Sequence, residues 1–312
     1  MSLAVVGSIA FDAVKTPFGE RERMLGGSAV HFSLASSFFT DVHVFGPVGD
    51  DFGPEEYGIL EDRSVNTDGI EKIEGGKTFF WRGHYEFDLN TAHTDDTQLN
   101  VFGDFEPKLN DAAKNADVLF LANIQPDLQR GVRQQCEDAK FVGLDSMNLW
   151  IDIAKDSLLE TIKLVDAVFM NDAEIRALTG QSNLIKAARE LLELGPQLVI
   201  AKQGEYGAAL ITKDSFFALP AYPLEDVIDP TGAGDSFAGG FLGYVAQHLS
   251  EGGELDNDTF RRAMAYGSTM ASFNVENFGT ERVRALSGDE IAERFADFKA
   301  ITHFESVEVS YR

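Results

Sequence analysis

The stretch that most limits how this chain can fold is residues 224–249, where a glycine turn leads directly into a helix. Val227 and Ile228 are predicted to form a short strand ahead of the turn, which has the sequence GAG at 232–234. The helix is predicted to begin at or just before Asp235, because apolar residues then recur every four positions and share one face. These residues are Phe237, Phe241, Val245 and Leu249.

This turn has the chemistry of an anion site. The first amides of a helix lack intrahelical acceptors, and the helix dipole adds a partial positive charge there. Because glycine has no Cβ, a phosphate can approach the backbone amides of Gly232, Ala233 and Gly234. Asp235 would repel such an anion, so its presence favours a base that takes a proton from a hydroxyl attacking phosphorus. The alternative is that Asp235 only caps the helix.

Strands and helices alternate along most of the chain. Short apolar runs predict strands at 3–7, 42–49, 118–122, 141–144, 167–170, 198–201 and 208–211. Helical stretches are predicted at 128–139, 184–194, 260–275 and 287–300. This order argues for a parallel sheet with helices on both faces. Residues 78–87 differ, because apolar residues alternate with polar ones there and predict a strand with one apolar face.

Composition excludes several classes of protein. Acidic residues outnumber basic ones 51 to 26 in the 312 residues, and the net charge of −25 disfavours binding to nucleic acid or to an anionic membrane. The single cysteine, Cys136, excludes an internal disulfide and a cysteine-based zinc cluster. The first residues lack a signal-peptide pattern and no run of about 18 apolar residues occurs, so we expect a cytoplasmic protein.

The segment 229–241, DPTGAGDSFAGGF, resembles the signature of the ribokinase-like (PfkB) carbohydrate kinase family. Other segments match motifs of this family in the expected order: 7–12 (GSIAFD), 26–31 (GGSAVH), 46–53 (GPVGDDFG), 171–174 (NDAE) and 202–207 (KQGEYG). The resemblance implies an α/β fold, namely a doubly wound, mostly parallel sheet flanked by helices, with a small β-strand lid. It also implies a kinase that uses ATP and Mg²⁺ to phosphorylate a hydroxyl of a small carbohydrate-like substrate.

The resemblance assigns roles around the substrate. Asp235 is the implied catalytic base, and the amides of the glycine turn form the implied anion hole. Asp12, Gly26, Gly27 and His31 are implied to bind the substrate. At His31 the family usually has Asn, and a neutral His offers one donor and one acceptor in a larger ring. His31 therefore leaves the substrate open, and it is equally well explained as a core histidine on a helix face.

Further roles concern the cations. Asn171 and Glu174, three residues apart at a predicted helix start, are implied to hold Mg²⁺ through its waters. The same two residues also fit a capping box that satisfies the first amides of the helix. Asp229 and Thr231 are implied to contribute to a possible K⁺ site, and the K⁺ requirement stays open.

The nucleotide is implied to meet Lys202, Gly204 and Gly207, although an ordinary hairpin turn explains these glycines as well. Residues 145–148 (DSMN) are expected to line the pocket, because relatives carry D-x-N at a strand end.

The resemblance also divides the chain into two parts. The main α/β kinase domain is expected at 1–10, 25–71 and 105–312, and the β lid at 11–24 and 72–104. A closing lid would exclude water from the γ-phosphate. Its exposed aromatic face could equally form a homodimer contact.

Two alternatives to a sugar kinase remain open, and a third is disfavoured. A nucleoside kinase of the same family could stack a base on Phe79 or Trp81. A member of the fold could bind ligands without catalysis, although the intact GAGD sequence argues against this. A dinucleotide-dependent oxidoreductase would need a G-x-G-x-x-G sequence after the first strand, which this chain lacks.

Overall fold

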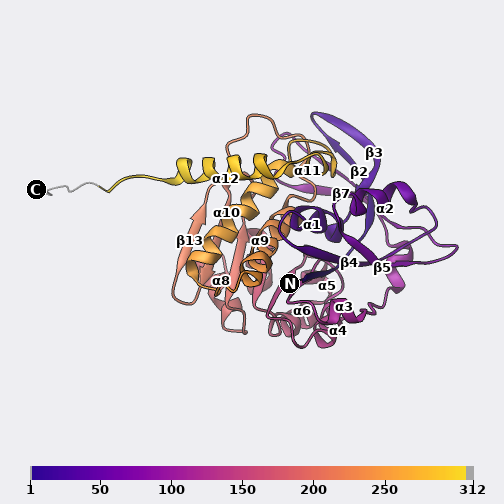
Figure 1. Ribbon diagram of the computed structural model, residues 1–312, viewed down its shortest axis with the longest axis horizontal. Coiled ribbons are helices and arrows are strands. Elements are labelled where there is room, and N and C mark those ends of the chain that lie inside the picture. Colours follow the sequence, from indigo (N-terminus) through magenta and orange to yellow (C-terminus); the bar gives the residue numbers. More distant parts are fainter. Residues whose placement is uncertain (1, 307–312) are drawn as a thin grey trace, which may run out of the picture.

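In a computed structural model that describes residues 2–306, a nine-stranded sheet carries helices on both faces (Figure 1). The strand order is β13-β12-β11-β10-β9-β8-β1-β4-β5. All neighbours from β11 to β5 pair in parallel, whereas β12 and β13 extend one edge in antiparallel fashion. The strands are β1 Ser2–Val6, β4 Asp41–Val48, β5 Asn66–Lys72, β8 Val118–Leu121, β9 Phe141–Asp145, β10 Ala167–Asn171, β11 Leu198–Lys202, β12 Ala208–Thr212 and β13 Phe216–Leu219.

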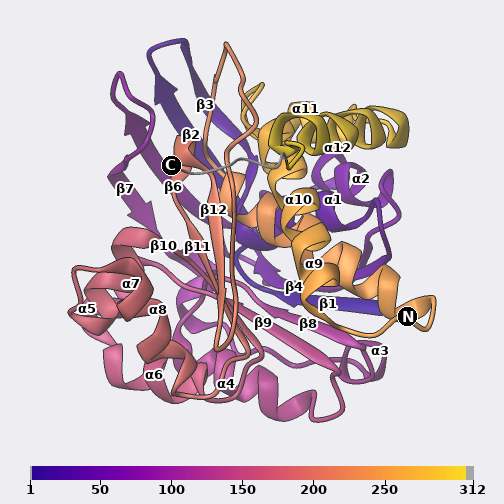
Figure 2. The same ribbon diagram turned by 90° about the vertical axis from the view of Figure 1, so that its left-hand side faces the viewer.

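Each face of this sheet packs on its own group of helices (Figure 2). Leu3 and Val5 of β1 belong to one apolar cluster and Ala4 and Val6 to the other, because successive side chains of a strand point to opposite faces. The first face carries α1 Ser28–Ser36, α2 Pro54–Glu61, α9 Ala233–Ser250, α10 Asn257–Asn274, α11 Glu281–Arg284 and α12 Gly288–Thr302. The second carries α3 Asp111–Lys114, α4 Pro126–Gln135, α5 Asn148–Ile153, α6 Lys155–Ile162, α7 Asp172–Thr179 and α8 Leu184–Leu192. Within residues 2–306, no helix is both long and apolar enough to cross a membrane.

A second sheet of four strands stands beside the main sheet as the lid (Figure 2). Its order is β3-β2-β6-β7, with β2 Ala10–Thr16, β3 Gly19–Gly26, β6 Phe79–Tyr85 and β7 Ala92–Gln98. The β2 strand pairs antiparallel with β3 and parallel with β6, which comes much later in the chain. The short 3-10 helices are η1 Asn100–Asp104, after β7, and η2 Gly204–Tyr206, after β11. The four lid strands agree with the expected lid, while the division into two domains stays a prediction.

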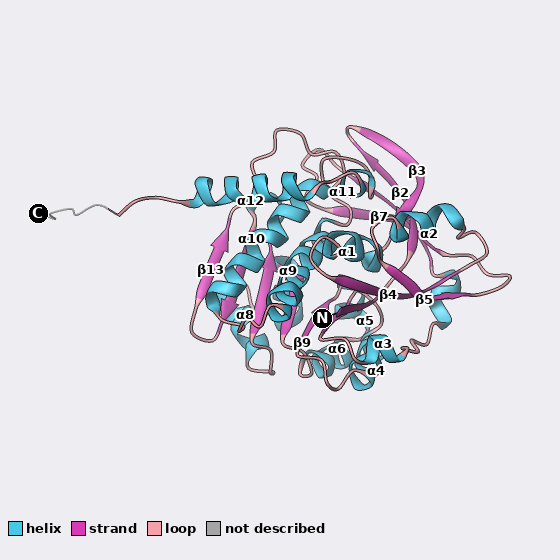
Figure 3. Ribbon diagram, in the orientation of Figure 1, coloured by secondary structure: helices cyan, strands magenta, loops and turns pink. Residues whose placement is uncertain are grey.

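The predicted α/β fold is confirmed, and the strands predicted from apolar runs are present (Figure 3). The helix predicted near Asp235 begins at Ala233, with Gly232 as its N-cap. The predicted strand at Val227 and Ile228 is wrong. No strand forms there, because the N–H groups of Ile228 and Asp229 both donate to the single carbonyl of Val275, at 2.8 and 3.3 Å.

Candidate active site

Polar residues end three neighbouring strands of the main sheet and form one side of the candidate active site. The β9 strand ends at Asp145, β10 at Asn171 and β11 at Lys202. These strands run in parallel, so the three residues lie at the same edge, where ligands of open α/β sheets bind. The glycine turn before α9 reaches this edge too, since a Cβ atom on Gly234 would lie 2.9 Å from Lys202 Nζ.

Acidic side chains surround the ammonium group of Lys202. Its Nζ lies 2.8 Å from Asp145 Oδ2, and Glu174 and Asp235 also act on its charge. Burial opposes the charged form of Lys202, but the three acidic neighbours outweigh burial and raise the pKa of Lys202. Burial raises the pKa of Asp235 to about 7, with Asp145 adding to the rise and Lys202 opposing it. A carboxylate with a pKa near neutrality suits a general base that acts at pH 7.

The glycine turn leaves two backbone amides available to an anion. Gly232 has φ 76°, a left-handed conformation that glycine adopts without strain. The N–H of Ala233 donates to the Pro230 carbonyl at 3.1 Å, so this amide is used within the turn. Among residues 2–306, no acceptor takes the N–H of Gly232 or of Gly234. Two of the three amides expected to bind phosphate are therefore free, and their role stays a prediction.

Thr231, the residue before Gly232, is held through three groups. Its N–H donates to Asp229 Oδ1 at 2.9 Å, its hydroxyl donates to the Tyr85 hydroxyl at 3.2 Å, and its carbonyl accepts from Asn274 Nδ2 at 2.7 Å. Asp229 is fully buried, and its Oδ2 accepts from the N–H of Gly279 at 3.0 Å. Asp229 thereby joins the turn to the segment after α10. The K⁺ site expected at Asp229 and Thr231 stays a prediction.

Asp12, on the lid strand β2, lies close to the glycine turn. Its side chain is buried, and burial raises its pKa to about 7, with Asp229 and Asp235 contributing through their charge. A Cβ atom on Gly26 would lie 1.9 Å from Asp12 Oδ2, so only glycine allows the carboxylate to lie against this backbone. Gly27 has φ 94° and precedes helix α1 as its N-cap. The structure brings Asp12, Gly26 and Gly27 together, and their contact with substrate stays a prediction.

His31 belongs to helix α1, and its buried side chain faces the glycine turn. Its Nδ1 lies 3.0 Å from Asn274 Oδ1, and a Cβ atom on Gly232 would lie 2.3 Å from its ring. Burial lowers the pKa of His31, although Asp229 and the Asn274 contact oppose the decrease, so the imidazole is neutral at pH 7. Its Nε2 is buried and has no hydrogen-bond partner within residues 2–306. His31 therefore packs against the glycine turn, and a substrate contact stays a prediction.

An aromatic surface lies beside Asp12 on the lid. Trp81 of β6 pairs with Asp12 of β2 in register, so both side chains leave the same face of the lid sheet. The indole ring lies over Gly83, where a Cβ atom would come within 2.3 Å of it, and its Nε1 donates a hydrogen bond to β7. Phe79, the other residue expected to stack a base, instead stacks on a phenylalanine of η1 with ring centroids 5.3 Å apart.

The turn after β11 meets the connection between lid strands β6 and β7. Gly204 has φ 55° and Gly207 has φ 98°, and a Cβ atom on Gly207 would lie 2.0 Å from the last carbonyl of β13. Gly207 is therefore required by packing within the main sheet. Asn90 Nδ2, in the β6–β7 connection, donates to Glu205 Oε1 at 2.9 Å. ATP contacts of Lys202, Gly204 and Gly207 stay predictions.

Asn171 and Glu174 form a capping box at the start of α7. Asn171 Oδ1 accepts from the N–H of Glu174 at 2.8 Å, and Glu174 Oε2 accepts from the N–H of Asn171 at 2.8 Å. Burial raises the pKa of Glu174 to about 7, with Asp145 adding to the rise and Lys202 opposing it. No three His, Cys, Asp or Glu side chains of residues 2–306 converge as direct metal ligands. The carboxylates around Lys202 nevertheless outnumber its single ammonium group. Their net negative charge fits Mg²⁺ held through its waters.

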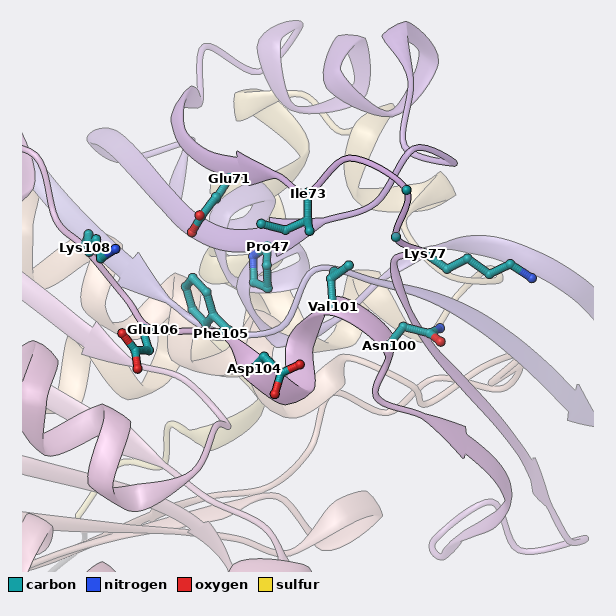
Figure 4. A pocket seen from close by; sticks show the side chains of 12 residues that line it. Pro47, Glu71, Ile73, Lys77, Asn100, Val101, Asp104, Phe105, Glu106 and Lys108 are labelled. Atoms are coloured by element: carbon teal, nitrogen blue, oxygen red, sulfur yellow. The ribbon is translucent and has the colours of Figure 1, made fainter.

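Two cavities lie outside the group formed by Asp12, His31 and Asp235. The larger, about 550 Å³, lies between η1 and the β5 edge of the main sheet, and its lining includes Pro47 and Phe105 (Figure 4). The smaller, about 430 Å³, opens on the lid face that carries Phe11 and Phe80, opposite to the face of Asp12 and Trp81. Neither cavity belongs to the candidate active site.

Three contacts of the site leave no signal in the sequence. Asn274 lies in a helix of small residues and follows no recognisable motif. Tyr85 belongs to the alternating pattern of β6, which indicates its face but not its partner Thr231. The pairing of Asp145 with Lys202 joins the ends of strands β9 and β11. Only the packing of distant segments creates these contacts.

Comparison with known proteins gives consistent results. A model of the pfkB family of carbohydrate kinases matches residues 2–284. The chain is 28% identical over 248 residues to the cytidine kinase of Thermococcus kodakarensis, covering 78% of this chain and 87% of that protein. A nucleoside kinase of Burkholderia thailandensis in complex with inosine superposes with a TM-score of 0.76 at 20% identity, covering 96% and 99% of the two chains. A putative ribokinase II of E. coli in complex with ATP and Mg²⁺ has a TM-score of 0.78 at 18% identity, covering 95% and 99%.

Proposed function

The chain belongs to the pfkB family of carbohydrate kinases and is an ATP-dependent phosphotransferase, and within this family we propose that it is a nucleoside kinase. The γ-phosphate of ATP is transferred to a hydroxyl of the nucleoside sugar. Sequence similarity to a cytidine kinase supports this choice, as does structural similarity to a nucleoside kinase in complex with inosine. A nucleoside rather than a free sugar thus becomes the first candidate substrate.

The pairing of Asp12 with Trp81 is the observation that carries this proposal. A nucleoside combines a polyol sugar with a flat base, and the lid presents a carboxylate and an indole ring side by side on one face. Because Gly83 has no Cβ, the indole ring lies across the strand as a flat surface. Stacking of a base on such a ring contributes about 1–3 kcal/mol. A free sugar would leave this aromatic surface unused.

Asp235 acts as the base in the proposed reaction. Its carboxylate takes the proton of the substrate hydroxyl, whose oxygen then bonds to the γ-phosphorus. The bond between this phosphorus and the β–γ bridging oxygen breaks, and ADP leaves. The N–H groups of Gly232 and Gly234 donate to the phosphoryl oxygens as negative charge spreads over them. Asp12 and the adjacent glycine backbone hold the sugar hydroxyls.

The residues at the strand ends serve the nucleotide and its cation. Asn171 and Glu174 would hold Mg²⁺ through its waters, and the nearby Asp145 adds negative charge. When bound, Mg²⁺ neutralises negative charge on the ATP phosphates. Lys202 lies against the turn at Gly234, where its ammonium group attracts the transferred phosphate. The turn at 204–207 faces the nucleotide from the same edge of the sheet.

The proposal is tested by measuring ADP release from Mg-ATP with cytidine, inosine, adenosine and ribose as acceptors. We expect turnover with at least one nucleoside to exceed turnover with ribose. Trp81→Ala should raise the KM for that nucleoside about tenfold or more and leave the KM for ribose unchanged, because only the base loses its stacking partner. Phe87→Ala is the matched control, since Phe87 lies just beyond β6 and is 94% exposed.

Other results of these measurements would indicate a different function. Turnover that is equal for ribose and all nucleosides, and unaffected by Trp81→Ala, would contradict a nucleoside kinase. No turnover with any acceptor, while ATP still binds, would favour a ligand-binding protein without catalysis.

A kinase for ribose or a similar sugar is the second candidate. It is favoured by the similarity to the putative ribokinase II, and Asp12 with Gly26 and Gly27 could hold the hydroxyls of a free sugar equally well. The same acceptor panel separates the two, because a sugar kinase would prefer ribose and would not respond to Trp81→Ala.

Three expectations extend the proposal. Residues 11–24 and 72–104 would move as a lid against a main domain at 1–10, 25–71 and 105–312. A homodimer would form through this lid, whose outer strand β7 is exposed along its whole length. Light scattering of the protein and of a variant with Pro in β7 tests the dimer.

Turnover in K⁺ compared with Na⁺ tests the expected site at Asp229 and Thr231.

A further inference from the structure

The carboxamide of Asn274 connects helix α1 with the glycine turn and the start of α9, two parts of the active site that are far apart in the sequence. Asn274 is fully buried at the end of α10. Its Oδ1 accepts from Ser236 Oγ at 3.0 Å and lies 3.0 Å from His31 Nδ1, while its Nδ2 donates to the Thr231 carbonyl at 2.7 Å. We propose that Asn274 is a positioning residue that aims the N–H of Gly232 into the phosphate site and fixes the tautomer of His31.

The partners of Asn274 determine the orientation of its carboxamide. The Thr231 carbonyl can only accept a hydrogen bond, so the NH₂ group must face it. The carbonyl oxygen of Asn274 then faces Ser236 and His31, and it can only accept. His31, which is neutral, must therefore carry its proton on Nδ1 and leave a lone pair on Nε2.

The bond to Thr231 sets the direction of the next amide. The peptide between Thr231 and Gly232 is trans, since residues 2–306 contain no cis peptide bond. In a trans peptide the C=O and the following N–H point in opposite directions. With the Thr231 carbonyl held by Asn274, the N–H of Gly232 points away from α10. This N–H is one of the two free amides of the turn.

This peptide needs an anchor because of the glycine that follows it. Gly232 has φ 76° and ψ 0°, and glycine allows the preceding peptide plane to rotate at little cost. A rotated plane would put the Thr231 carbonyl oxygen toward the phosphate and repel it. Asn274 opposes that rotation through its Nδ2, and the His31 ring lies against the Cα of Gly232, where a Cβ atom would come within 2.3 Å of it.

The inference rests on the proposed kinase function. It is tested by removing the hydrogen-bond donor of Asn274 separately from its acceptor. Asn274→Asp keeps an oxygen that accepts from Ser236 and His31 but cannot donate to the Thr231 carbonyl. We expect kcat to fall about 10- to 100-fold, less than the loss of an anion-hole donor, with KM for ATP and for the acceptor almost unchanged. Asn274→Ala, which removes both the donor and the acceptor without burying a charge, should lower kcat at least as much.

Thr269→Val is the matched control, because Thr269 is fully buried on the same helix and its hydroxyl has no partner within residues 2–306. It should leave kcat unchanged. Wild-type kcat in Asn274→Ala would overturn the proposal, and so would an equal loss in Asn274→Ala and Thr269→Val. If Asn274→Asp does not fold, the kcat of Asn274→Ala alone decides whether the proposal holds.

A second measurement does not depend on activity. Nitrogen-15 NMR of the histidine side chains should show His31 protonated at Nδ1 in the wild type, and a mixture of tautomers in Asn274→Ala. A proton on Nε2 in the wild type would refute the assigned network. A wild type that phosphorylates no acceptor would refute the proposed function, yet the NMR result would still report on the network.

Discussion

The hydroxyl of Tyr85, on lid strand β6, accepts a hydrogen bond from the hydroxyl of Thr231 at 3.2 Å. Thr231 directly precedes Gly232, the N-cap of α9, so one side chain of the lid touches the turn that is proposed to bind the transferred phosphate. If the lid closes over the substrate as proposed, Tyr85 connects this closure with the geometry of the turn.

Tyr85→Phe should loosen the closed lid, because it removes the bond to Thr231 and keeps the ring. We expect kcat to fall about fivefold, which corresponds to one hydrogen bond worth ~1 kcal/mol. ATP hydrolysis without acceptor should rise, since water reaches the phosphate more easily. Tyr222→Phe is the control, because it removes a hydroxyl that bonds to Asp297 on the surface. Unchanged hydrolysis in Tyr85→Phe would show that this contact does not control water entry.

Asp235→Asn should reduce kcat about 10²- to 10⁴-fold, because the amide cannot take a proton from the substrate hydroxyl. ATP affinity, measured by calorimetry, should stay within about twofold, since the free amides of Gly232 and Gly234 are unaffected. Asp226→Asn, in the exposed segment before the turn, controls for the loss of one negative charge. Near-normal turnover in Asp235→Asn would rule out this residue as the base.

The pH dependence of kcat/KM should show a rising limb near pH 7. Asp235 must be deprotonated to act as a base, and burial raises its pKa to about 7 in the free enzyme. Activity should therefore fall as the pH decreases through this value. Asp145→Asn should move the limb to lower pH, because Asp145 raises the pKa of Asp235, whereas Lys202→Met should move it to higher pH. Shifts in the opposite directions would contradict this electrostatic account.

Asp12→Asn should stabilise the protein at pH 8 more than at pH 5. Burial raises the pKa of Asp12 from 3.8 to about 7, so folding favours the protonated carboxyl. The stability that this proton provides is present at low pH and is lost as the pH rises through about 7. An Asn side chain removes the cost of the buried charge, and we expect Tm at pH 8 to rise by a few degrees. An equal change in Tm at both pH values would argue against a raised pKa.

The sequence allowed most of the main sheet to be predicted, because buried parallel strands such as β8 and β11 are short, continuous apolar runs. Lid strand β7 has the sequence AHTDDTQ and is exposed throughout, so no apolar alternation indicates it. At Val227 and Ile228 the opposite happens, because the sequence predicts a strand where none forms. Their side chains suit a strand, but their backbone lies beside the end of α10 and has no partner strand.

The candidate site was predictable where its residues are contiguous. The segment from Asp229 to Asp235 combines the turn, the N-cap and the proposed base in one motif. By contrast, Asn274 acts on Thr231 from another helix, and Lys202 meets Asp145 across two strands. Such contacts depend on how α10 and the sheet pack together, which no local pattern contains.

The parallel pairing of β2 with β6 has a consequence for folding. Two parallel strands cannot be joined by a tight turn, and here the residues between them include β3, α1, β4, α2 and β5. Contacts between segments so far apart in the chain form slowly. We therefore expect the lid sheet to be completed late during folding and to open first when the native state fluctuates. A protease should cleave the connection between β6 and β7 before it attacks the main sheet.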